Sequence, residues 1–125
     1  MISKKLLSEV LSVDLSNKNN MLDPVPAGTE RGSDVIFYWL QNEDRFYNGN
    51  SISIYQLANM CKEWAFKQKF PYCITSRIID DYKGKWEAET GYGFGVPASV
   101  DFIADSEPAA IFLACEWIMK QKELK

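Results

Sequence analysis

Acidic side chains gather late in the sequence, and they are the residues best suited to chemistry. Only Lys83 and Lys85 oppose them between positions 80 and 107. The acidic residues of this stretch are Asp80, Asp81, Glu87, Glu89, Asp101, Asp105 and Glu107. Paired carboxylates can bind Mg²⁺ or Ca²⁺, or act as acid and base. Two other interpretations stay open: a surface for a basic partner, or a solvated polar face, where most Asp and Glu residues are found.

The strict alternation of residues 85–96 indicates a strand that places some of these carboxylates together. Glu87 and Glu89 share its outer face with Gly91 and Gly93, and a neighbouring strand can add Asp101. The stretch 91–98 contains G-x-G-x-x-A, a weak match to a dinucleotide-binding motif. A proline and a further strand pattern replace the required helix, so we expect no dinucleotide. Because Gly91 and Gly93 have no side chains, the outer face of this strand either lets another stretch of backbone lie close to it or forms a slot for a ligand or peptide.

Trp117 completes the set of candidate surface residues. It is displaced from the main apolar stripe of its predicted helix, which suits an interface anchor or the edge of a core. The predicted partner surface therefore comprises Glu87, Glu89, Gly91, Gly93, Asp101 and Trp117.

Several chemistries are excluded by residues that the sequence lacks. There is no histidine, which removes Ser-His-Asp and Cys-His catalysis and histidine-bound metals. The three cysteines contain no CxxC pair, and Cys61, Cys73 and Cys115 are all expected to pack in the core. We therefore predict no catalytic residue, no cofactor and no cysteine-based metal site.

Composition indicates one globular domain over residues 1–125. Hydrophobic residues make up 46% and charged residues 25%, which are the values of a folded chain. No window reaches the length of a membrane span, and the first residues lack the apolar core of a signal peptide, so a cytoplasmic location is expected. The net charge of −3 disfavours general binding to nucleic acid.

The first half of the chain reads as helix, loop, strand and helix. Ser3 caps a predicted helix at 4–11, and a loop rich in Ser, Asn, Asp, Pro and Gly fills 12–33. Residues 34–40 are almost entirely apolar, which predicts a strand covered on both faces. Residues 41–50, with Asn48-Gly49, predict a turn. A helix then starts near Ser53 and ends at Phe70-Pro71.

The second half predicts a meander followed by a helix. Strands are expected at 71–79, 85–96 and 99–104, and the last helix is capped by Ser106. The expected class is α+β in two layers: an antiparallel sheet of about four strands packed against two main helices. The predicted order is α-β-α-β-β-β-α.

Three segments together resemble small uncharacterised proteins of bacteriophages and prophages. They are the opening Met1-Ile-Ser-Lys-Lys-Leu-Leu-Ser-Glu-Val-Leu11, the helix segments Ile54-Tyr-Gln-Leu-Ala58 and Cys61-Lys-Glu-Trp-Ala65, and the end segment Ser106-Glu-Pro-Ala-Ala-Ile-Phe-Leu-Ala-Cys-Glu-Trp-Ile118. The resemblance covers about a third of the chain and implies no catalytic residues. It implies a mobile-element setting, in which small proteins often bind a host or phage protein.

These observations leave competing hypotheses. The first is a non-enzymatic binding or accessory protein of a phage or mobile element, with a protein partner. The alternative is a carboxylate-based enzyme, or a small-ligand or metal binder, on the meander; it predicts that Glu87, Glu89 and Asp101 converge within metal-bridging distance. Nucleic-acid binding through Tyr92 and Phe94 is disfavoured, since both lie on the predicted core face. A homodimer through an uncovered sheet edge also stays open.

Overall fold

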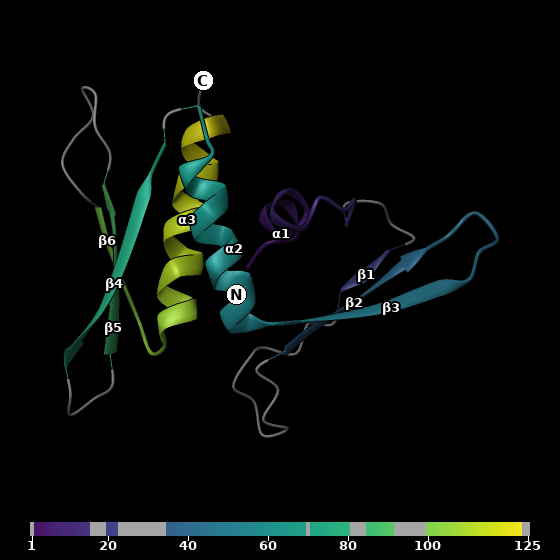
Figure 1. Ribbon diagram of the computed structural model, residues 1–125, viewed down its shortest axis with the longest axis horizontal. Coiled ribbons are helices and arrows are strands. Elements are labelled where there is room, and N and C mark those ends of the chain that lie inside the picture. Colours follow the sequence, from purple (N-terminus) through teal and green to yellow (C-terminus); the bar gives the residue numbers. More distant parts are fainter. Residues whose placement is uncertain are drawn as a thin grey trace. The chain divides into compact units, whose positions relative to one another are not determined.

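The computed structural model describes residues 2–15, 20–22, 35–69, 71–80, 85–91 and 100–123. The chain divides into two units (Figure 1): an N-terminal unit, Ser3–Leu57, and a C-terminal unit, Met1–Ile2 with Ala58–Lys125. The elements are α1 (Lys4–Leu11), β1 (Met21–Leu22), β2 (Val35–Gln41), β3 (Tyr47–Ser53), α2 (Ile54–Phe66), β4 (Cys73–Asp80), β5 (Lys85–Gly91), β6 (Val100–Ala104) and α3 (Glu107–Glu123). The predicted α+β class is confirmed. The single domain stays a prediction.

The N-terminal unit holds α1 and the antiparallel sheet β1-β2-β3. Helix α1 has the predicted bounds, because the Ser3 hydroxyl accepts a hydrogen bond from the Leu6 amide at 3.2 Å and caps the first turn. Strand β2 occupies the predicted place. Within the predicted loop 12–33, residues 21–22 form β1, while 16–19 and 23–34 lie outside the described residues.

Asn48-Gly49, the turn signal within the predicted turn 41–50, is not the turn itself, because residues 47–50 belong to strand β3. Gly49 pairs with Trp39 in the ladder, and the indole covers the place where a larger residue would put its side chain: a Cβ on Gly49 would stand 3.1 Å from Trp39 Nε1. The hairpin turns instead at 42–46. There, Asn42 Oδ1 accepts hydrogen bonds from two turn amides, and Arg45 adopts a left-handed φ of 66°.

Strand β2 is also less covered than its apolar sequence predicts. Ile36 is buried, whereas Phe37 on the opposite face is 40% exposed. Phe37 and Trp39 stack with ring centroids 6.5 Å apart. The strand belongs to a three-stranded sheet of its own and not to the meander.

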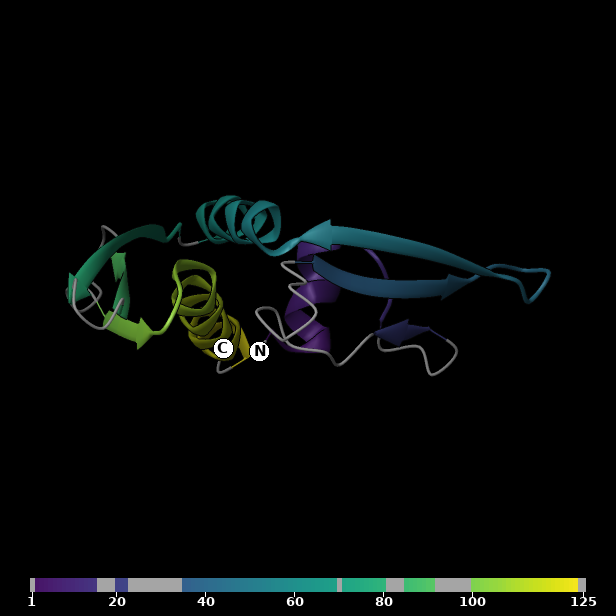
Figure 2. The same cartoon turned by 90° about the horizontal axis from the view of Figure 1, so that it is seen from below.

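The C-terminal unit is built on the predicted antiparallel meander β4-β5-β6. Helix α3 crosses one face of this sheet and contacts all three strands (Figure 2). Ala88 and Thr90 of β5 are buried on that face, and α3 buries Ile111 and Ile118. The predicted strand 85–96 is described as far as Gly91; residues 92–99 lie outside the described part.

Helices α2 and α3 lie side by side within this unit. The Cys115 thiol donates to the Cys61 carbonyl oxygen at 3.6 Å, and the Lys122 ammonium stands 5.6 Å from the Trp64 ring centre. The Ser106 hydroxyl accepts from the Ala109 amide and caps α3, as its sequence predicts. None of the helices in the described part of the chain has the length and apolarity needed to cross a membrane. A cytoplasmic location stays a prediction.

Candidate functional site

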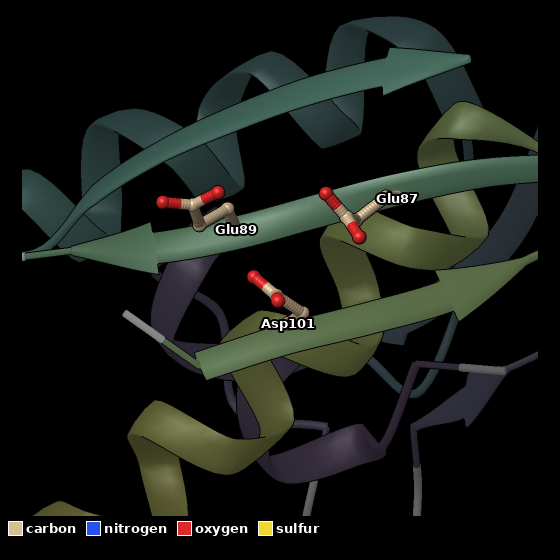
Figure 3. A group of neighbouring side chains, drawn as sticks. All are labelled: Glu87, Glu89 and Asp101. Atoms are coloured by element: carbon tan, nitrogen blue, oxygen red, sulfur yellow. The ribbon is translucent and has the colours of Figure 1, made fainter. Parts of the chain in front are cut away.

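The candidate site lies on the outer face of the meander, opposite the face that α3 covers. Side chains alternate along each strand, so Trp86, Ala88 and Thr90 point inward while Glu87 and Glu89 point outward. On β6 the same rule turns Asp101 outward. The three carboxylates therefore project from two neighbouring strands on the same face of the sheet (Figure 3).

The strand register brings these three side chains together. Glu89 stands directly opposite Asp101, and Glu87 is two residues along the same strand. Each residue contributes a carboxylate oxygen to a group in which all oxygens lie within 4.8 Å of one another (Figure 3). The predicted convergence of Glu87, Glu89 and Asp101 is thus confirmed. We call these three residues the acidic cluster.

One member of the acidic cluster is already paired. Arg77 Nε on β4 lies 3.0 Å from Glu87 Oε1, and the Glu87 side chain is only 12% exposed whereas that of Arg77 is 71% exposed. Among the described residues, Glu89 and Asp101 have no cation within ion-pair distance. Their mutual repulsion is consequently uncompensated, since like charges directly opposite each other destabilise a strand pair.

Arg77 is a site residue that the sequence reasoning missed. The signal was present: an antiparallel meander with residue 77 on an outward position places its guanidinium beside one of the outer glutamates, and Arg77 pairs with Glu87 in the ladder. Lys85 forms a further ion pair on this face, with Asp105 beyond the end of β6. Because Arg77 pairs with Glu87 and Lys85 pairs with Asp105, Glu89 and Asp101 are the members of the acidic cluster whose charge is not neutralised by a described cation.

The other residues of the predicted partner surface do not all lie beside the acidic cluster. Gly91 ends β5 on the outer face, and a Cβ there would meet nothing within 4 Å, which fits the predicted bare strand. Gly93 lies outside the described residues. Trp117 packs edge-on against Tyr72 at 5.8 Å and near Phe102 at 6.2 Å, so it sits on the α3 side of the sheet, away from the acidic cluster. Trp117 was expected to be either an interface anchor or part of the edge of the core, and these ring contacts favour the edge of the core.

The cysteines divide according to the face they occupy. Cys61 and Cys115 are fully buried, as predicted, and a hydrogen bond with Cys61, followed by burial, raises the pKa of the Cys115 thiol well above its usual range. The prediction is wrong for Cys73, which is exposed. Cys73 is the first residue of β4 and pairs with Gly91, which has no side chain to cover it.

The acidic cluster can attract cations, because three carboxylate oxygens lie together on one face of the sheet. Asp101 is exposed, and neither the cavity between α2 and β4 nor the one on the β2–β3 hairpin is lined by the cluster. The arrangement favours binding of positive charge.

No family model, curated protein or solved structure matches this chain. The resemblance to phage proteins therefore stays a prediction, and the site has to be interpreted from its geometry.

Proposed function

We propose that the chain is a non-enzymatic binding protein, and that the outer face of the meander binds a basic segment of a protein partner. The observation that carries the proposal is the direct opposition of Glu89 and Asp101, with no cation beside either among the described residues. A lysine or arginine placed between them converts a repulsion into two attractions. Charge complementarity of this kind selects partners and speeds their association.

Apolar surface beside the acidic cluster supports a protein partner over a small cation. Ile103 follows Asp101 by two positions on β6 and is 55% exposed. It stands opposite Glu87 in the ladder, so an exposed aliphatic side chain borders the carboxylates. Interfaces combine such apolar contacts with a charged surround. In the mobile-element setting implied by the resemblance, the partner is a host or phage protein.

The proposal is tested with a labelled peptide of alternating arginine and serine. The double variant Glu89→Gln/Asp101→Asn removes two charges while keeping side-chain size. Loss of two charge contacts at the surface is expected to weaken binding about tenfold. The control Glu43→Gln/Asp44→Asn makes the same change of net charge in the β2–β3 turn, where both residues are exposed. Equal affinities of the Glu89/Asp101 variant and the unaltered chain would refute the proposal.

A divalent cation is the second candidate ligand, and a separate observation favours it. Calcium–oxygen distances of about 2.3–2.6 Å place ligand atoms up to about 5 Å apart, and the cluster oxygens lie within 4.8 Å of one another. Three carboxylates supply only part of a shell of six to eight oxygens, so binding near the weak end, about millimolar, is expected.

Calorimetry with CaCl₂ and MgCl₂ on EDTA-treated protein separates the two candidates. Heat of binding that disappears in Glu89→Gln/Asp101→Asn, without any affinity for the basic peptide, would favour the cation. Affinity for the peptide that EDTA leaves unchanged would favour the protein partner. Absence of both would remove the acidic cluster as a binding site.

A further inference from the structure

A groove of about 350 Å³ lies in the C-terminal unit, where the chain leaves α2 and enters β4. None of the residues of the acidic cluster line it, and a backbone hydrogen bond connects two of its sides. The Tyr72 amide donates to the Ala65 carbonyl oxygen at 3.1 Å, which folds the connecting segment back on the last turn of α2. The volume falls in the lower part of the range that small-molecule sites occupy.

The lining of the groove is largely apolar. Tyr72 and Ile74 are 8% and 6% exposed and form its buried part, whereas Phe66, the last residue of α2, is 59% exposed at its border. A phenyl ring in water beside an apolar groove is stabilised by any apolar group that covers it. The groove therefore favours an occupant with an apolar body.

The charged residues of the groove favour an anion. Lys62 and Lys67 both line it, and Glu63 is the single acidic residue among the lining side chains, which leaves one positive charge in excess. No carboxylate of the described chain is within ion-pair distance of either ammonium. This local excess is opposite in sign to the net charge of −3 of the whole chain.

We propose that this groove binds a small amphipathic carboxylate, such as a medium-chain fatty acid. The apolar chain covers Phe66 and enters beside Tyr72 and Ile74, while the carboxylate faces Lys62 and Lys67. This inference is independent of the proposed function, because it involves neither the acidic cluster nor a protein partner.

Cys73 supplies a reporter of occupancy. It lines the groove and is exposed, whereas Cys61 and Cys115 are buried. Alkylation of the native chain by iodoacetamide is therefore expected at Cys73, and peptide mass spectrometry measures its rate. An occupant of the groove slows this reaction. Octanoate is the probe, and octanol is the control that has the same chain without the charge.

Octanoate below its micelle concentration is expected to slow alkylation of Cys73 at least about fivefold, and octanol to protect more weakly. The variants Phe66→Ala and Lys67→Gln are each expected to raise the octanoate concentration needed for half protection about fivefold to tenfold. Leu113→Ala removes an exposed apolar side chain from α3, outside the groove, and is expected to leave it unchanged.

Lack of protection by octanoate, equal protection by octanol, or an equal effect of Leu113→Ala would each overturn the proposal. Circular dichroism of each variant verifies that its fold is retained. Both groove substitutions are at exposed positions, so loss of the fold is not expected.

Discussion

Neutralising Glu89 is expected to stabilise the fold. Its carboxylate lies within 4.8 Å of those of Glu87 and Asp101, and two like charges at that separation repel by about 0.9 kcal/mol in a water-like dielectric. Arg77 offsets part of the repulsion from Glu87. Glu89→Gln keeps the side-chain shape, so the free energy of unfolding is expected to rise by about 1 kcal/mol at low ionic strength.

Urea denaturation in EDTA measures this change. A gain of about 1 kcal/mol moves the midpoint by about 0.5 M urea for an m-value near 2 kcal/mol/M. The gain is expected to shrink in 1 M salt, where the Debye length falls to about 3 Å. The control is Glu63→Gln, because Glu63 follows Lys62 in the sequence and shares the groove lining with it and Lys67, so its removal relieves no repulsion. A midpoint that is unchanged or lowered, or a gain that salt does not reduce, would refute the reasoning.

Three further predictions concern the core of the C-terminal unit. Ile111→Ala is expected to lower the free energy of unfolding by about 2–5 kcal/mol because Ile111 is buried, whereas Leu113→Ala, at an exposed position of the same helix, changes it by less than about 1 kcal/mol; thermal or urea unfolding compares them. Thr90→Val is expected to cost about 1 kcal/mol in the same assay, because the buried hydroxyl donates to a β6 carbonyl at 3.1 Å; equal stability would contradict this role. The raised pKa of Cys115 keeps its thiol protonated in the folded chain, whereas the unfolded chain loses that proton above about pH 8.5, so this contribution to stability is present below that pH and is lost as pH rises. Cys115→Ala is therefore expected to show a smaller loss of stability between pH 8 and 10 than the unaltered chain.

The helices could be predicted from sequence because their signals are local. A serine cap and apolar residues at helical spacing define α1 and α3 without reference to the rest of the fold. Strand β3 was missed because its local signal pointed to a turn. Asn48-Gly49 is typical of a tight turn, and the reason for glycine there is the Trp39 indole on the adjacent strand, which local sequence does not reveal.

The site could be predicted in part for a similar reason. A two-residue period and an antiparallel meander were enough to place Glu87 and Glu89 on one face with Asp101. The exposure of Cys73 could not be predicted, because it depends on which residue of β5 stands opposite. That partner is Gly91, and the register is set by pairing between strands and not by either strand alone.

The ion pair between Arg77 and Glu87 has a consequence for which ligands the proposed binding surface would favour. Any incoming cation finds one carboxylate already occupied by a guanidinium held at 3.0 Å. A singly charged group can use Glu89 and Asp101 only, whereas a ligand of higher charge density can also compete for Glu87 by displacing the exposed Arg77 side chain. We therefore expect the proposed binding surface to favour ligands that present several positive charges at once, because Arg77 already competes with a single cation for Glu87.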